Sequence, residues 1–175
     1  MKVKSVSKLH HISLNLTQSQ AMVETFHRHS KPLKRHMFSI GAVLYPGQWW
    51  FDCVGVITVD RCSSAWSKRR DHVEIRRLCT TPDAPKNTAS YLLARAKEAC
   101  FAMGYNCIVT YTKPSESGAS LKGAGFYLQK ARWSPGHPDH PKGLLQWICV
   151  RDEQPSISER TWTKDTLEQI KNDMK

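Results

Sequence analysis

The segment with the clearest chemical character is a short loop that leads into a predicted helix. It reads Ala84-Pro85-Lys86-Asn87-Thr88-Ala89-Ser90, and its residues are small or able to form hydrogen bonds, with Lys86 adding a positive charge. The first turn of a helix offers free N–H groups and the positive end of the helix dipole, so such a loop can bind a pyrophosphate. An ordinary N-cap by Asn87 or Thr88 would explain the same composition.

The loop joins a predicted strand to a predicted helix, and a second strand follows the helix. These three elements must position the loop. His72–Thr80 alternates like a strand, and Cys107–Thr112 is an apolar run typical of a buried strand. Between them, helical spacing places one set of side chains on a single buried face: Ala89, Leu92, Leu93, Ala96, Cys100 and Met103. Gly104 supplies a C-cap. A strand–loop–helix–strand unit predicts that the two strands are parallel.

The remaining chain predicts further strands and short helices around this unit. Residues 3–16 are expected to be extended, and a helix is expected over 18–29 with Ala21, Met22, Thr25 and Phe26 on one face. Strands over 37–45 and 49–59 form an antiparallel hairpin around Pro46-Gly47, followed by an exposed basic loop over 60–71. A short helix (118–123) and two strands (127–133 and 144–150) complete the sheet.

The length and charge of the chain limit its domain organisation and the partners it can have. The 175 residues suit a single domain, which we assign to 1–152, followed by an amphipathic helix over 153–175. The net charge of +11 favours polyanionic partners such as DNA, RNA or an anionic cofactor, although it would also serve solubility alone. Neither a membrane span nor a secretory signal is evident, and the six cysteines suit reduced core positions, so we expect a cytoplasmic protein.

The ordered series of elements resembles the GNAT superfamily of acyl-CoA N-acyltransferases over roughly residues 38–150. The strand, loop and helix resemble the coenzyme-A-binding part, and Ser120-Leu121-Lys122-Gly123-Ala124-Gly125-Phe126 is similar to a late helix that ends in a Gly-Phe turn. The family loop follows Gln/Arg-x-x-Gly-x-Gly/Ala, whereas this chain has Ala84 and Asn87 at the first two defined positions and fits only at Ala89.

This resemblance implies a fold and an acyl donor. The expected architecture is α/β (α+β), with a mixed, mainly antiparallel sheet of six or seven strands, flanking helices and a central splayed parallel pair. The expected donor is acetyl-CoA. Nine residues would line its pyrophosphate and pantetheine arm: Leu78, Cys79, Thr80, Pro85, Lys86, Asn87, Thr88, Ala89 and Ser90.

A narrower resemblance concerns the acceptor. The Pro-Lys-Asn loop, the Arg-Arg-Leu-Cys-Thr strand and the upstream segment Phe26-His27-Arg28-His29-Ser30-Lys31-Pro32 look like a phage-associated branch of the fold. That branch resembles the Mom-type DNA modification proteins, which alter adenine in phage DNA. The implied acceptor is a nucleic-acid base.

Acyl transfer from a thioester to an amine needs a base for the amine and donors for the oxyanion, and an acid assists the leaving thiolate. The resemblance assigns the base to Glu74 and the acid to Tyr111, with Ser117 or Ser120 as further hydroxyls. The alternative for Glu74 is a surface carboxylate paired to Arg76 or Lys68. The alternative for Tyr111 is a half-buried core aromatic.

Several residues outside this unit are candidates for contact with the acceptor. His27 and His29 flank Arg28, and both can face one site if the segment is extended. As a metal pair they lack a carboxylate partner, so no metal is expected. Lys68, Arg69 and Arg70 would contact phosphates. Trp49, Trp50 or Trp66 would stack on a base, or would simply fill the core.

Three functions are consistent with these features. The first is an acetyl-CoA-dependent acyltransferase acting on a nucleic-acid base, with Glu74, Tyr111, Ser120 and His29 as the catalytic candidates. The second, favoured by the departures in the loop, is a basic nucleic-acid-binding module that keeps the fold without catalysis. The third is an N-acetyltransferase for a small-molecule or protein amine. The sequence leaves the oligomeric state open.

Overall fold

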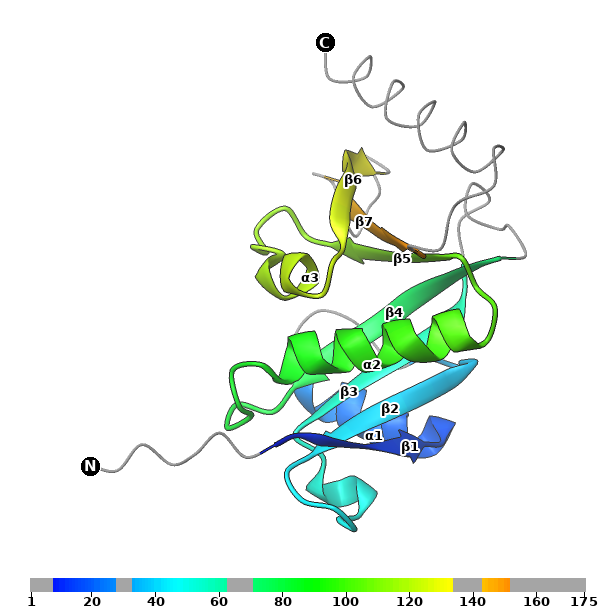
Figure 1. Ribbon diagram of the computed structural model, residues 1–175. Coiled ribbons are helices and arrows are strands. Elements are labelled where there is room, and N and C mark those ends of the chain that lie inside the picture. The colour runs from blue at the N-terminus through cyan, green and yellow to red at the C-terminus, as the bar shows by residue number, and fades with distance from the viewer. Residues whose placement is uncertain (1–7, 28–32, 63–70, 134–142, 152–175) are drawn as a thin grey trace.

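The computed structural model describes residues 8–27, 33–62, 71–133 and 143–151. Within them the chain forms seven strands, three α-helices and one 3-10 turn, shown in Figure 1. In chain order these are β1 (His10–Leu14), α1 (Leu16–Phe26), β2 (Phe38–Val43), η1 (Trp50–Asp52), β3 (Gly55–Arg61), β4 (His72–Thr80), α2 (Thr88–Ala102), β5 (Cys107–Thr112), α3 (Ala119–Gly123), β6 (Tyr127–Trp133) and β7 (Leu144–Val150).

All seven strands join one mixed sheet in the order β1-β2-β3-β4-β5-β7-β6. β4 and β5 run parallel, and every other neighbouring pair is antiparallel. The crossover between β4 and β5 contains α2, as the strand–loop–helix–strand pattern predicts. The predicted fold class is therefore confirmed.

The parallel pair separates along its length. β4 and β5 are paired from His72 opposite Cys107 to Ile75 opposite Thr110, although β4 continues to Thr80 and β5 to Thr112. Figure 1 shows the two strands meeting at one end and diverging toward the other. The predicted splay thus begins directly after the Ile75–Thr110 pair.

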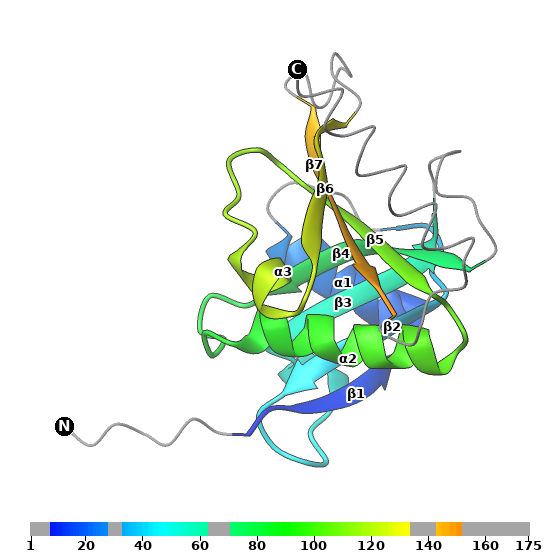
Figure 2. The same ribbon diagram turned by 45° about the horizontal axis from the view of Figure 1, so that its top comes forward.

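Helices cover both faces of the sheet (Figure 2). Leu92, Leu93 and Ala96 of α2 are fully buried in the main core, together with strand residues such as Ile57 and Ile75. A second core lies on the opposite face, where Met22 and Val23 of α1 pack against Val43, Val56 and Cys79. Because successive strand residues point to opposite faces, the central strands β2, β3 and β4 contribute to both cores.

The structure corrects several element boundaries. α1 begins two residues before the predicted start because Asn15 and Gln18 form a reciprocal capping box, and it ends at Phe26 rather than His29. Its buried residues are Ser19, Met22 and Val23, whereas Thr25 is exposed.

Two further expectations were wrong in detail. Residues 50–52 form the turn η1, so the second hairpin strand starts only at Gly55, and it extends through Asp60 and Arg61 instead of ending in a loop. Met103 is 56% exposed because α2 ends at Ala102 and the chain turns away from the core. The predicted C-terminal helix over 153–175 lies outside the described residues.

All six cysteines are buried and carry free thiols, which confirms the prediction that they are core residues. Among the residues that the structure describes, none of the helices is both long and apolar enough to cross a membrane. In the same part of the chain, no group of three or more His, Cys, Asp or Glu side chains is arranged to hold a metal ion.

Candidate active site

The N-terminus of α2 is open to a ligand. The N–H of Thr88 donates to the carbonyl of Pro85 at 3.0 Å, and that of Tyr91 donates to Asn87 at 2.9 Å. Among the described residues, the backbone N–H groups of Ala89 and Ser90 between them have no backbone acceptor. Asn87 stands at the N-cap position, but its exposed side chain makes no capping hydrogen bond. Capping by Asn87 therefore does not explain the loop, and two N–H groups remain for an anion.

Close packing fixes this helix end beside the end of β4. A Cβ added to Gly55 would lie 3.0 Å from both the Leu92 Cδ1 and the Thr88 Cγ2 atoms, so the helix approaches β3 as closely as a glycine permits. Thr88 is fully buried there, and its hydroxyl has no hydrogen-bond partner among the described residues. The N–H of Thr81, just after β4, donates to Val54 at 2.9 Å. The loop is thus held against the sheet at both ends.

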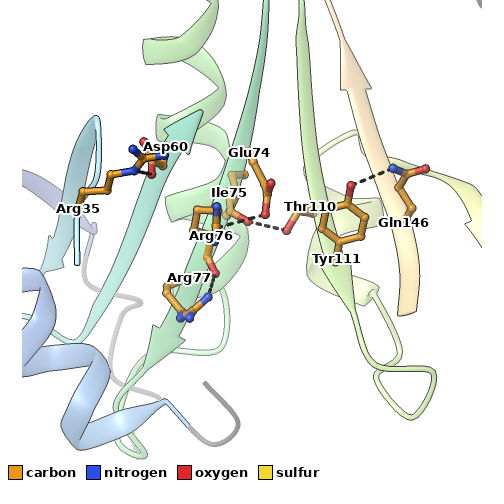
Figure 3. Close-up of polar contacts among 9 residues, drawn as sticks. All are labelled: Arg35, Asp60, Glu74, Ile75, Arg76, Arg77, Thr110, Tyr111 and Gln146. Atoms are coloured by element: carbon orange, nitrogen blue, oxygen red, sulfur yellow. Dashed lines mark hydrogen bonds and ion pairs between the residues drawn. The ribbon is translucent and has the colours of Figure 1, made fainter. Parts of the chain in front are cut away.

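The point where β4 and β5 separate is marked by a buried hydroxyl and a bulge. The Thr110 hydroxyl donates to the Ile75 carbonyl at 3.1 Å, across the last paired position (Figure 3). On the other side of β4, Arg77 pairs with Thr58 and Ile75 with Val59, so Arg76 is an extra residue. A bulge increases local twist, which explains why β4 turns away from β5 here.

Two carboxylates lie next to each other on the α1 face of the sheet at this point. Glu74 of β4 is directly opposite Asp60 of β3, and both are buried, at 5% and 6% exposure. Glu74 Oε1 lies 3.3 Å from Arg76 Nε, while Asp60 Oδ2 lies 3.5 Å from Nε of the exposed Arg35. The expected Arg76 pairing is present, but Glu74 is not a surface carboxylate because only 5% of it is exposed.

Tyr111 lies on the neighbouring strand, on the same face as Glu74. Glu74 is paired with Val109, and Tyr111 follows two residues later on β5 (Figure 3). The Tyr111 hydroxyl accepts a hydrogen bond from Nε2 of the buried Gln146 at 3.0 Å. The Tyr111 ring is half-buried and packs against Val109 and Ile148, as the core alternative requires, while its hydroxyl forms a polar pair with Gln146.

The other predicted residues are less closely grouped. Ser120 lies on α3, where its carbonyl accepts from the N–H of Ala124. His27 follows α1, and its N–H donates to Val23. Leu78 faces the main core, and the Cys79 side chain is buried under α1, with its Sγ 3.9 Å from the Met22 carbonyl. Only the main chain of Cys79 can therefore contact a ligand between β4 and β5.

Part of the predicted acceptor site cannot be placed. Arg28 and His29, the basic run Lys68, Arg69 and Arg70, and Trp66 lie outside the described residues. Their roles remain predictions.

Sequence reasoning missed three polar residues of the site: Asp60, Thr110 and Gln146. Asp60 is predicted in a loop because the β-branched run Val54-Gly55-Val56-Ile57-Thr58-Val59 ends just before it, whereas β3 continues through Asp60 to Arg61. Thr110 and Gln146 occur inside apolar strands, where a polar residue often signals a specific partner.

Comparison with solved structures identifies the fold. The chain matches an acetyltransferase from Bacillus subtilis in complex with CoA, with a TM-score of 0.61 and 15% identity over 82% of this chain and 99% of that one. It also matches the ribosomal-protein-S18-alanine N-acetyltransferase of Escherichia coli (TM-score 0.56, 11% identity, 85% and 100% covered). A GNAT family N-acetyltransferase from Escherichia coli in complex with CoA gives a TM-score of 0.57 at 12% identity, with 83% and 84% covered.

These similarities show that the chain has the GNAT fold, in agreement with the predicted resemblance. No protein-family model and no curated protein sequence matches the chain.

Proposed function

We propose that this protein is an acyl-CoA-dependent N-acyltransferase with acetyl-CoA as its donor. The observation that carries the proposal is the combination of two features at one end of the sheet: the parallel pair β4 and β5 separates after Ile75, and the uncapped N-terminus of α2 lies at the end of β4. Solved structures that share this fold include acetyltransferases in complex with CoA.

The donor would be held by the two features together. The N–H groups of Ala89 and Ser90, with the helix dipole and Lys86, favour a pyrophosphate. From there the pantetheine arm would run along the main chain of β4 beyond Ile75, where β5 no longer pairs with it. Bound acetyl-CoA would supply an activated thioester carbonyl beside the bulge at Arg76.

The side chains on the α1 face would then carry the proton transfers. The Glu74 carboxylate would take a proton from the acceptor amine as its nitrogen attacks the thioester carbon. The backbone at the bulge would donate hydrogen bonds to the carbonyl oxygen as it gains charge. The carbon–sulfur bond would then break, and the Tyr111 hydroxyl would protonate the leaving sulfur.

For the acceptor, we propose an exocyclic amine of a nucleic-acid base. Support comes from the net charge of +11 and from the basic segments of the sequence. Nucleosides from cells that express the wild-type chain should contain an acylated base, detected by mass spectrometry, and cells that express Glu74→Gln should not. If neither sample contains one, while acetylation of a small-molecule or protein amine is measured, the acceptor assignment is wrong.

Donor binding tests the proposal itself. Asn87→Ile places a β-branched side chain at the helix N-terminus, where it would obstruct the approach of a pyrophosphate. We expect calorimetry to show acetyl-CoA binding to the wild type and none to this variant. Ala102→Ile is the matched control, since it adds the same side chain at the exposed opposite end of α2 and should bind normally.

Circular dichroism of Asn87→Ile should match that of the wild type. Unchanged affinity in this variant would remove the loop from the donor site. A wild type that binds nucleic acid but not acetyl-CoA would instead support the non-catalytic nucleic-acid-binding module.

A further inference from the structure

Three aromatic side chains project into solvent from the loop between β2 and β3. Tyr45, Trp49 and Phe51 are 61%, 69% and 66% exposed, respectively. The rings of Trp49 and Phe51 are parallel, with centroids 6.4 Å apart. Trp49 therefore does not fill the core, which was the alternative to a role in stacking. Exposed aromatic groups of this size indicate a binding surface.

The loop is built to hold these rings in place. The side-chain oxygen of Gln48 accepts from the N–H groups of Leu44 at 2.9 Å and Tyr45 at 2.8 Å. The Asp52 carboxylate accepts from the N–H of Trp49 at 3.0 Å. Trp50, which lies between Trp49 and Phe51 in the sequence, packs against the second core, on the α1 face of the sheet. Because its own side chains fix the loop, the rings are preorganised for a ligand.

A basic hollow lies beside this aromatic loop. Its volume is about 490 Å³, and it is lined by Lys8, Leu9, His10, His11, Asn87, Tyr91 and Arg95. The Arg95 guanidinium lies 5.5 Å from the centre of the Tyr91 ring, and His11 Nδ1 lies 3.0 Å from the Tyr91 hydroxyl. Arg95 also pairs with Glu98 at 2.8 Å, yet its buried Nε has no hydrogen-bond partner among the described residues. Among the described residues, the lining contains no carboxylate.

The hollow and the aromatic loop meet at the start of β1. His10 is paired with Val43, the last residue of β2, and the loop leaves the sheet two residues later at Tyr45. Leu9, just before His10, and Leu44, just before Tyr45, pack in the same main core. Figures 1 and 2 both show the start of β1 between the N-terminal end of α2 and the loop that carries η1.

We infer that this surface binds single-stranded nucleic acid, with phosphates in the basic hollow and bases on the rings of Trp49 and Phe51. The inference deepens the proposed function, since it rests on the nucleic-acid acceptor. Cationic grooves beside stacking aromatic side chains are the features that bind single strands without sequence preference. In a duplex, the base faces are stacked on each other and cannot reach the rings.

The rings and the hollow together favour this ligand over two others. An anionic membrane would be contacted by the rings, but it would leave unused a hollow that contains Tyr91 and the unpartnered Nε of Arg95. A second copy of this chain would bring another surface of a protein with net charge +11 toward Lys8 and Arg95. A polyanion with planar groups satisfies both the rings and the cations.

Fluorescence anisotropy with a labelled oligothymidylate of about ten nucleotides tests the inference. We expect the double variant Trp49→Ala/Phe51→Ala to bind it about 10- to 100-fold more weakly than the wild type. Met103→Ala, an exposed apolar residue at the other end of α2, is the control and should bind normally. Asn87 lines the hollow and also begins the donor helix, so the rings are what separate the two proposals. Calorimetry of the double variant with acetyl-CoA should therefore give the wild-type affinity.

The role of the positively charged side chains is tested by the dependence of oligonucleotide affinity on salt concentration. Arg95→Ala should reduce the slope of log affinity against log salt by about 0.7, because one phosphate of the single strand is then no longer neutralised. Arg61→Ala, at the exposed far end of β3, should leave the slope unchanged. Tighter binding of a duplex, unchanged binding by the double variant, or ring-dependent binding of anionic lipid vesicles without oligonucleotide binding would overturn the inference. Self-association that needs the rings, again without oligonucleotide binding, would also overturn it.

Discussion

Buried acidic side chains are costly unless they are paired, and this protein keeps two of them side by side. Glu74 and Asp60 occupy opposite positions on β4 and β3, where Glu74 pairs with Arg76 and Asp60 with Arg35. The partner of Asp60, Arg35, is itself 81% exposed, so that ion pair contributes little to stability. The weak Asp60–Arg35 ion pair does not account for the burial of two carboxylates side by side, whereas the proposed role of Glu74 as the base would.

Replacement of Glu74 by glutamine tests that role with almost no change in volume. We expect turnover to fall about 10²- to 10⁴-fold, because the amide cannot accept the proton of the acceptor amine. The affinity for acetyl-CoA, measured by calorimetry, should stay unchanged, since the pyrophosphate would be held at the N-terminus of α2 and glutamine keeps the size of the Glu74 side chain. Glu24→Gln, an exposed carboxylate on α1, is the control. Wild-type turnover in Glu74→Gln would show that another residue is the base.

Most elements of this fold could be predicted from the sequence because their signals are local. β4, β5, β6 and β7 match the predicted ranges, since alternation or an apolar run bounded by turn residues defines each of them. The start of α1 differs from its prediction because the Asn15–Gln18 capping box begins the helix at Leu16, two residues before the predicted start. In the site, the proximity of Asp60 to Glu74 depends on strand register, and the splay depends on the bulge at Arg76. Neither is encoded in any short segment.

The element α3 depends on a close approach that only glycine allows. Gly118, its N-cap, has φ +63°, and an added Cβ would lie 2.6 Å from Cη2 of Trp147. Trp147 is in turn held by its indole N–H, which donates to the Thr112 hydroxyl at 2.9 Å. The absence of a side chain at Gly118 therefore lets the start of α3 pack against the Trp147 ring of β7, beside the end of β5.

We expect Gly118→Ala to lower the free energy of unfolding by about 2–4 kcal/mol, from the left-handed backbone and the collision with the ring together. Gly123→Ala, in the same helix, is the matched control because its Cβ would meet nothing within 4 Å. Urea unfolding followed by circular dichroism measures both. Equal stability of the two variants would contradict this account of α3.

At the scale of the whole molecule, one sheet carries two chemically different faces. The α2 face is almost wholly apolar, whereas the α1 face combines a small core with Glu74, Asp60, Tyr111 and Gln146. These polar groups lie near the point where β4 and β5 separate, and Glu74, Asp60 and Gln146 are buried there on the face opposite the main core. The six thiols are distributed through the cores and make stability depend on pH.

Burial raises the pKa of three of these thiols from 9.0, to about 11 for Cys53 and to about 12 for Cys79 and Cys100. In the unfolded chain the thiols ionise near pH 9, whereas in the folded protein they stay protonated. Stability that is fully present below this pH must therefore be lost as the pH rises toward about 11–12. Between about pH 9 and 10 we expect a loss on the order of 1 kcal/mol per thiol.

Urea unfolding at about pH 8, 9 and 10 measures this loss. Lysines also lose charge over the upper part of this range, which relieves repulsion in a protein of net charge +11 and acts in the opposite direction. A decline would therefore have to come from groups such as the buried thiols. Cys100→Ala should be less stable at every pH because it leaves a small cavity, but its stability should decline less steeply above pH 9. A decline as steep as that of the wild type would show that the Cys100 thiol does not contribute to it.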